Sequence, residues 1–246
     1  MCIRDRVKVK GTEGNKATLK IKRYFKSANA RKVEAAKKEI YLDSTNLDGV
    51  LLFFVQHPDY RFSIDEDGYA SYHNSSGNWN HTKNRFYEVK IDFTIELSVP
   101  KTTNLNISTH QKNLTISNIN ADVVSQNHHG HIELNAIGGN VQAHTHHGEI
   151  EASLTKAPTK DAVFDTHHGN IEISFPNNLS ADISLKTKHG NFYTEFDYQP
   201  MARPISYNKH KKGTKYKIEA GTNIRINKGG PKLCFETYHG NIYLLK

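Results

Sequence analysis

A short pattern, Thr-x-x-Gly-x-Ile, recurs along the second half of this 246-residue chain and constrains its fold more than any other feature. Successive copies begin 18, 18, 21, 21 and 50 residues apart. A period near 20 residues is typical of a solenoid, in which each repeat forms one coil and neighbouring coils share a core. The copies, two of them degenerate, are Thr109–Leu114, Asn127–Ile132, Thr145–Ile150, Thr166–Ile171, Thr187–Phe192 and Thr237–Ile242.

Mostly apolar residues flank each copy at a spacing of two, which is the spacing of side chains on one face of a strand. These positions have the same parity as the Thr and the Ile of the pattern. We therefore predict a strand on each side of the turn, with these columns pointing inward. The columns are Leu105, Val123, Val141, Ala162, Ile183 and Leu233; Ile107, Ser125, Ala143, Phe164, Leu185 and Phe235; and Ile116, Leu134, Ala152, Ile173, Thr194 and Leu244.

The glycine of the pattern is predicted to form the corner between the two strands, because glycine adopts a positive φ without a steric clash. A second corner lies between copies, marked by Ala136–Asn140 in one coil and by Phe175–Asn178 in one of the longer coils, and the coils differ mainly in this outer loop. The structural turn glycines are Gly130, Gly148, Gly169, Gly190 and Gly240.

The long interval before the last copy, residues 197–230, is either an insertion or contains one more, poorly matched coil around Tyr216–Ile226. The last copy ends almost at Lys246 with no evident cap. We therefore expect the last coil to leave an edge that could pair with another chain.

Residues 7–100 predict a β-rich extension, continuous with the solenoid, that contains one short helix near residues 28–38 with Ser27 as its N-cap. The best strand is Tyr87–Val99, which alternates apolar and polar residues and ends at Pro100. Residues 57–85 are polar and predict a loop or weak hairpin. Residues 1–6 resemble translated sequencing-adapter sequence and are set aside as non-native, so we expect the natural start, with any signal peptide, to be missing.

Composition narrows the class of protein. The mean hydropathy is −0.67, and no stretch approaches the ~20 apolar residues of a membrane span. The net charge of +8 is divided equally between residues 1–100 and 101–246, which is a weak nucleic-acid signal because a binding footprint should cluster. Two cysteines, Cys2 and Cys234, form neither a disulfide framework nor a metal quartet.

These residues resemble a family of bacterial adhesin-type domains of unknown function. The family repeats Thr-x-Asn-Gly-x-Ile after a strand that ends in Val-Pro, as Val99-Pro100 does here. The resemblance implies an all-β fold, a single-stranded right-handed parallel β-solenoid (β-helix-like), and export to the periplasm, outer membrane or cell surface. It implies no catalytic or binding residues and no cofactor. This chain departs from the family pattern by having histidine where asparagine is usual before the glycine.

Twelve of the 15 histidines lie in residues 101–246. In a parallel solenoid equivalent positions stack, so His129, His147, His168, His189 and His239 should form one ladder, and His110, His128, His146 and His167 a second. Such ladders could bind Zn²⁺, Cu²⁺ or Ni²⁺. The simpler interpretation is that histidine replaces asparagine at a turn position. Protonation near pH 6 should make the rings repel and lower the stability of the array.

Two other charged features have a functional and a simpler interpretation. Glu133, Glu151 and Glu172 occupy equivalent outward positions and form either a Ca²⁺ or sugar-binding strip or an exposed face screened by lysines and solvent. The basic run Lys209–Lys217 either holds an anionic polymer or is a solvated loop.

The sequence favours an exported, non-catalytic binding or structural module of adhesin type, not an enzyme. Its partner is unknown; a cell-surface polysaccharide or a protein would suit it. The alternatives are a carbohydrate-active β-helix enzyme and a metal-binding or pH-responsive histidine scaffold. An enzyme needs paired carboxylates, and the only candidates, Asp161, Asp165 and Asp182, do not share one column.

Overall fold

The computed structural model describes residues 3–47, 49–64, 70–74, 86, 88–202, 205–210, 213–218 and 221–246; for 3–4, 64, 70–74, 205–210 and 213–218 it describes the backbone. The described chain is all-β apart from one helix, as predicted. It divides into two compact units, one of residues 1–4 and 22–93, the other of residues 5–21 and 94–246. The second unit contains the repeats, and we call it the array.

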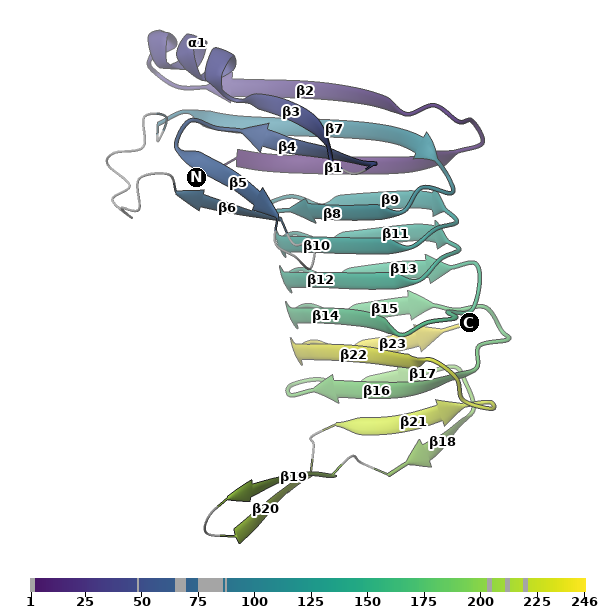
Figure 1. Cartoon of the computed structure of the whole chain (residues 1–246). Helices are drawn as coiled ribbons and strands as arrows, with labels where there is room; N and C mark the ends of the chain where they lie inside the picture. The colour runs from purple at the N-terminus through teal and green to yellow at the C-terminus, as the bar shows by residue number, and fades with distance from the viewer. Residues whose placement is uncertain are drawn as a thin grey trace. The chain divides into compact units, whose positions relative to one another are not determined.

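Each repeat in the array supplies one strand to each of two sheets, and the coils stack in register (Figure 1). All six coils pair in parallel with their neighbours. The first sheet contains β9 (Leu114–Ile119), β11 (Ile132–Ile137), β13 (Ile150–Leu154), β15 (Ile171–Ser174), β17 (Phe192–Thr194) and β23 (Ile242–Leu245). The second contains β8 (Leu105–Thr109), β10 (Val123–His129), β12 (Val141–His147), β14 (Ala162–His168), β16 (Ala181–Thr187) and β22 (Lys232–His239).

The coils are not stacked in sequence order. The last coil of the chain, β22 and β23, lies between the β14–β15 coil and the β16–β17 coil in both sheets. In Figure 1 the yellow strands β22 and β23 lie between green ones. The prediction that the last coil leaves an open edge is therefore wrong, because β22 pairs with β14 on one side and with β16 on the other.

The described strands of the interval at residues 197–230 form an end cap and not a further coil. Strand β21 (Thr222–Ile226) runs antiparallel to β16, and β18 (Tyr198–Met201) runs antiparallel to β21, so the second sheet is mixed. Arg225 binds Asp182 of β16 through Nε–Oδ1 and Nη2–Oδ2 hydrogen bonds of 2.6 and 2.9 Å. Between β18 and β21, the backbones of β19 (Ile205–His210) and β20 (Gly213–Ile218) form a hairpin.

At the other end of the array, β1 (Ile3–Thr12) pairs in parallel with β9, followed in the sheet by β7 (Lys90–Pro100) and β2 (Thr18–Lys26). Strand β1 begins inside the segment that was set aside as non-native. Within it, Asp5 accepts hydrogen bonds from the backbone N–H groups of His110 and Gln111 at 3.2 and 3.3 Å. Asp5 thus binds the first, degenerate corner of the array.

The predicted inward columns form the core of the array. Five of the six residues of the Ile column, Leu114, Ile132, Ile150, Ile171 and Ile242, are fully buried, and the sixth, Phe192, is half-buried against the core. The Phe164 and Phe235 rings stack inside the core with centroids 5.1 Å apart, because β14 and β22 are neighbours. The columns were predicted correctly, whereas the order in which their members stack was not.

The corner glycines are required by close packing and not, in general, by positive φ. A Cβ on Gly148 would lie 2.2 Å from the carbonyl oxygen of Gly130, and one on Gly240 would lie 1.9 Å from that of Gly169. Of the five glycines, Gly169 alone has a positive φ, of 153°. The prediction that the corner needs positive φ is therefore wrong for the other four.

The threonine of the pattern holds the same corner from inside. Thr145, Thr166 and Thr237 are buried and Thr187 is half-buried. Each donates through Oγ1 to the glycine carbonyl of the preceding coil in the stack, at 2.8–3.0 Å. Asn127 does the equivalent through its amide, which donates to the Lys112 carbonyl at 2.8 Å. The glycine lets adjacent coils approach and the threonine joins them, so both recur at a fixed spacing.

Replacing Thr166 by valine should lower the free energy of unfolding by about 1–2 kcal/mol, because it removes a buried hydroxyl donor at nearly constant volume. Thr166 is 1% exposed, and its hydroxyl lies 2.8 Å from the Gly148 carbonyl oxygen. Thr115→Val, at a half-exposed outward position, is the matched control and should cost less than about 0.5 kcal/mol. Equal losses for both variants in chemical denaturation would contradict this role.

The other unit contains α1 (Ala30–Glu39) and the antiparallel pairs β3 (Tyr41–Leu47) with β4 (Val50–Gln56) and β5 (Tyr60–Ile64) with β6 (Ala70–Asn74). The helix was predicted, but its N-cap is Asn29 and not Ser27, since the Asn29 side chain accepts from the Lys32 N–H. The hairpin predicted in residues 57–85 is present as β5–β6, although much of that segment lies outside the described residues.

Candidate functional site

The five histidines before the corner glycines form a continuous stack, which we call the pre-glycine ladder. Ring centroids are 5.0, 4.9, 4.9 and 4.7 Å apart along it, and successive rings are within 4–11° of parallel. The spacing follows from the parallel sheet, which repeats every ~4.8 Å. The interleaved coil order fixes the order of the rings as His129, His147, His168, His239 and His189.

A second column, the flanking ladder, lies one residue earlier in each coil. Its rings, His110, His128, His146 and His167, have centroids 5.0–5.1 Å apart. Tyr238 continues the stack, 4.9 Å from His167, and the Lys188 ammonium lies 4.5 Å from the Tyr238 ring centroid. Sequence reasoning did not include these two residues, although they occupy the same position of the pattern.

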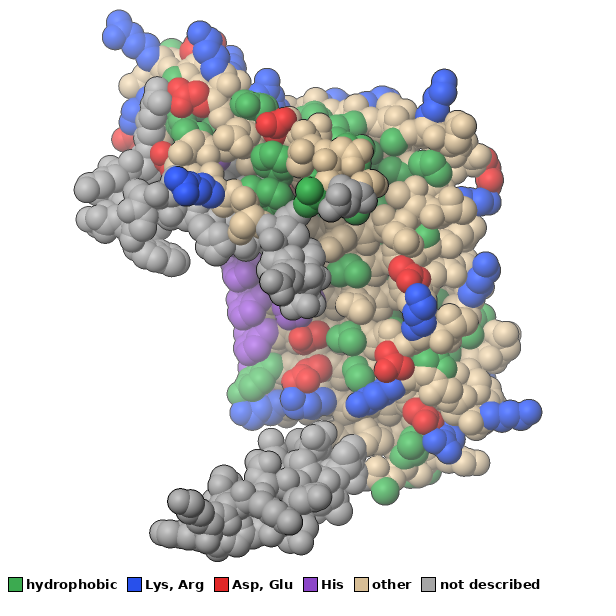
Figure 2. Space-filling model, in the orientation of Figure 1, with side chains coloured by type: hydrophobic (Ala, Val, Ile, Leu, Met, Phe, Trp, Pro, Cys, Tyr) green, Lys and Arg blue, Asp and Glu red, His purple; other side chains and the backbone are tan. Residues whose placement is uncertain are grey.

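The two ladders touch along their whole shared length and make one surface, the histidine corner. Neighbouring rings of one coil meet edge to face, with centroids 4.2 Å apart for His128 and His129 and 4.4 Å apart for His167 and His168. Figure 2 shows these purple side chains gathered along one edge of the array. Most of the rings are exposed, so ligands in solution can reach them.

Packing of the rings against one another opposes their protonation. Desolvation, followed by the charges of adjacent imidazolium groups, lowers the pKa of five ladder histidines below the usual 6.5: His110, His128, His147, His168 and His239. By contrast, the Asp165 carboxylate, 3.0 Å from His144 Nδ1, raises the pKa of His144, which lies outside the ladders. The corner thus favours neutral imidazoles at neutral pH.

This geometry is unsuited to a shared metal ion. An imidazole lone pair lies in the plane of its ring, so rings stacked in parallel point their lone pairs side by side and do not converge at the ~2.0–2.1 Å needed by Zn²⁺. Among the described residues, no three His, Cys, Asp or Glu side chains are grouped so as to hold a metal ion. Metal binding by the five pre-glycine histidines therefore gains no support from the structure.

The array should melt at a lower temperature at pH 5 than at pH 8, by several degrees. A histidine whose pKa is lowered by folding stabilises the fold above its unfolded pKa of 6.5, and that stabilisation is lost as the pH falls below 6.5. His144, whose pKa is raised, acts in the opposite direction but is one group against five. Calorimetry across this pH range is the test, and an unchanged melting temperature would contradict it.

The predicted glutamate column is also present, on the first sheet. Glu133 pairs in register with Glu151, and Glu151 with Glu172. Glu133 is held by Asn135 Nδ2 at 2.8 Å and by the Thr115 hydroxyl at 3.4 Å. Both donors are uncharged and both bonds are exposed. They fit a solvated sheet face as well as a ligand strip.

The three aspartates considered for catalysis are not brought together. Asp161 accepts a hydrogen bond from the Lys232 backbone N–H at 2.8 Å, while Asp165 is paired with His144 and Asp182 with Arg225. Each carboxylate thus has its own structural partner, on a neighbouring coil for Asp161 and Asp165 and on the end cap for Asp182. The side chains of the basic run Lys209–Lys217 lie outside the described residues.

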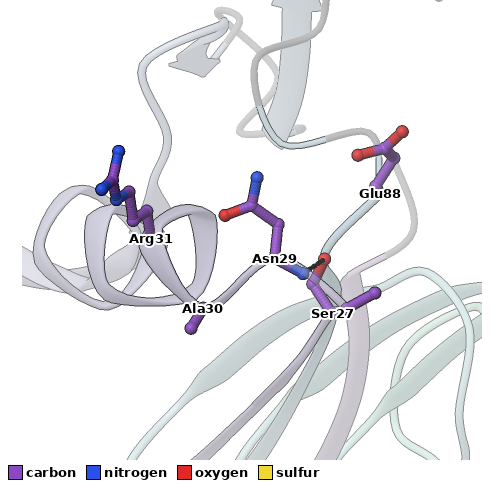
Figure 3. A pocket seen from close by; sticks show the side chains of 6 residues that line it. Ser27, Asn29, Ala30, Arg31 and Glu88 are labelled. Carbon is purple, nitrogen blue, oxygen red and sulfur yellow. Dashed lines mark hydrogen bonds between the residues drawn. The ribbon is translucent and has the colours of Figure 1, made fainter.

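A depression of about 770 Å³ lies in the other unit, beside the start of α1 (Figure 3). Its polar groups serve the helix end: Ser27 Oγ accepts from the Asn29 N–H at 3.3 Å, and Asn29 caps the helix. Glu88 on its rim pairs with Lys32 at 2.7 Å. The depression is therefore a helix-capping region, and the histidine corner is the stronger candidate site.

The fold defines the class of protein: a repeat-built, all-β protein of solenoid-like architecture. More particularly, the sequence model of the family described as Toastrack DUF4097 matches residues 66–230, so the chain belongs to that family. A crystal structure of a candidate cell adhesion protein from Clostridium sporogenes aligns with 98% of this chain and 89% of its own, at 10% identity and a TM-score of 0.39. No curated protein gives a significant match. No helix in the described part of the chain is long and apolar enough to cross a bilayer.

Proposed function

We propose that this chain is a non-catalytic, exported binding module of adhesin type, built on a right-handed parallel solenoid and acting at the cell envelope. The observation that carries the proposal is the repetition of outward side chains at one-coil intervals, in the two histidine ladders and the glutamate column. A surface of this kind offers many equivalent contacts along a line, which suits an extended polymer more than a single small substrate.

The separate engagement of Asp161, Asp165 and Asp182 also supports a non-enzymatic role, since glycoside hydrolysis needs two carboxyl groups facing one bond. The family supplies no activity of its own, because its description names none. The alternative of a carbohydrate-active enzyme has no specific observation in its favour. The alternative of a metal scaffold is tested by metal analysis of protein purified without an affinity tag.

The test is to incubate the full chain with a panel of envelope and acidic polysaccharides at pH 7.5, and to measure co-sedimentation together with the release of new sugar ends. We expect retention of at least one polysaccharide with no release of ends. Cleavage of any polysaccharide would overturn the non-catalytic assignment, and binding of none would overturn the assignment as a polysaccharide-binding module.

A further inference from the structure

We propose that the histidine corner is a pH-gated binding site for a linear acidic polysaccharide, a polymer with about one carboxylate on each sugar, which lies along the two ladders. This inference rests on the proposed envelope-binding function and names its ligand class and its regulation. It is carried by the geometry of nine imidazoles in two touching columns, with successive rings 4.7–5.1 Å apart.

The ladders contain no acidic residue of their own. The two positions of the pattern are filled by histidine, Tyr238, Lys188 and Gln111, so protonation builds positive charge that no ladder residue offsets. The Lys188 ammonium, which contacts Tyr238, adds a permanent charge at one end. A corner of this composition changes from neutral to strongly cationic as the pH falls through the histidine range.

The carboxylates on the elements packed around the corner are already engaged. Asp165 is paired with His144, Glu236 with Lys186, and the Glu149 carboxylate accepts from the Asn170 amide at 3.3 Å. Asp5 accepts hydrogen bonds from two backbone N–H groups, and its burial raises the pKa of its carboxyl group. Among the described residues, these neighbouring carboxylates already have partners, which leaves an external anion as the charge-balancing group for the ladders.

The shape of the ladders selects a linear ligand. Imidazolium groups stacked one coil apart repel one another, and an anion that bridges successive coils relieves that repulsion along the whole column. An extended 1,4-linked glycan advances by about one coil height per sugar, so its carboxylates can meet successive rings. Binding should take up protons, because the anion favours the charged imidazoles, and it should weaken with added salt.

The experiment measures the affinity of the full chain for alginate oligomers, a 1,4-linked acidic glycan, at pH 5.5 and pH 8. We expect binding at least about tenfold tighter at pH 5.5, in line with the response of electrostatic association to added charge. The double variant His147→Asn/His168→Asn removes two adjacent imidazoles from the middle of the pre-glycine ladder, so a measurable part of this pH dependence should disappear. The matched control His131→Asn/His144→Gln removes two histidines outside the ladders and should keep it. The control substitutions suit their positions, since Asn170, Asn191 and Asn241 occupy the position of His131, and Gln126 that of His144, in other coils.

Three results would overturn the inference: a ladder variant that keeps the full pH dependence, pH-independent binding in every protein, or a neutral 1,4-linked glucan that binds equally. Tighter binding of polyphosphate or a single-stranded oligonucleotide at pH 5.5 would overturn the polysaccharide class. If the ladder variant fails to fold, histidine C2–H resonances of the unchanged protein decide, because alginate should raise the pKa values of ladder histidines. Cleavage of alginate would contradict the proposed function, whereas loss of histidine dependence would contradict this inference alone.

Discussion

Replacing Gly240 by alanine should destabilise the array by about 3 kcal/mol or more, because the new methyl group cannot be accommodated without separating two coils. Its Cβ would lie 1.9 Å from the carbonyl oxygen and 2.5 Å from the carbonyl carbon of Gly169. Those atoms are backbone in a paired strand corner, and the Thr237 hydroxyl donates to the same oxygen at 3.0 Å. Separation would therefore break the hydrogen bond along with the packing.

Substitutions at two other glycines serve as controls that distinguish a steric clash from the strain of a positive φ. Gly49 has a φ of +83° and nothing lies within 4 Å of the position that a Cβ would take, so Gly49→Ala should cost only the left-handed strain of about 1 kcal/mol. Gly14 is exposed, and the nearest neighbour of its added Cβ, the Lys16 backbone nitrogen, would lie 3.9 Å away, so Gly14→Ala should be nearly neutral. Urea denaturation of the three variants gives the comparison. A loss for Gly240→Ala no larger than for Gly49→Ala would contradict the close-packing explanation.

Replacing Phe235 by alanine should cost about 3–5 kcal/mol, the usual range for a large aromatic residue in a core. Phe235 is 1% exposed, stacks on Phe164 at 5.1 Å and meets Phe175 edge to face at 6.4 Å. The effect should be this large because β22 lies inside the stack, with a coil on each side. A terminal coil would lose contacts on one side only.

The control for Phe235 is Tyr193→Ala, an outward position that is 47% exposed and stacks on Tyr243, where we expect a loss below about 1 kcal/mol. A double-mutant cycle of Phe164 and Phe235 should give a coupling energy of about 0.5–1.5 kcal/mol, because the two rings are in contact. Additive losses in that cycle would place the two rings on coils that do not touch, contrary to the stacking described above.

The sequence predicted the array because each structural requirement of the coil falls on a separate, repeated residue. The buried Ile column, the threonine that bonds to the previous coil and the glycine that admits it all recur at fixed offsets, so their alignment revealed the inward columns and the histidine ladders. The reason for the glycine was not visible, since positive φ and close approach of backbone both select a residue without a Cβ.

The coil order could not be predicted, because every coil carries the same columns and any coil can stack on any other. Side-chain fit between particular coils differs: Phe235 meets Phe164 only in the interleaved order, whereas Tyr243 meets Tyr193 in either order. A periodic sequence pattern does not indicate which coils form such contacts. The histidine corner shows the same limit of prediction. The two ladders were predicted, but the continuation of the flanking ladder by Tyr238 and Lys188 was not, because it depends on which coils are neighbours.

The measurement that most directly tests the interleaved array is a disulfide between β14 and β22. Val163 faces Cys234 in register, and Cys234 faces Ser184 on its other side. Facing residues of paired strands lie ~4.8 Å apart, within the ~4.4–6.8 Å Cα separation that a disulfide spans. In a Cys2→Ser background, Val163→Cys should form an intramolecular disulfide with Cys234 under mild oxidation, and Ser184→Cys should do so as a positive control.

The reciprocal protein carries Val163→Cys and Ser184→Cys with Cys234→Ser. Its two thiols lie on strands separated by β22 in the interleaved order, but would lie on neighbouring strands if the coils stacked in sequence order. Free thiols are counted under denaturing conditions in the monomeric fraction of each protein. The interleaved array predicts a disulfide between positions 163 and 234 and none between 163 and 184. The coil order, and with it the continuous histidine corner, would be contradicted by the opposite pair of results. These are a disulfide between 163 and 184 in the reciprocal protein and free thiols at 163 and 234 in the Val163→Cys protein.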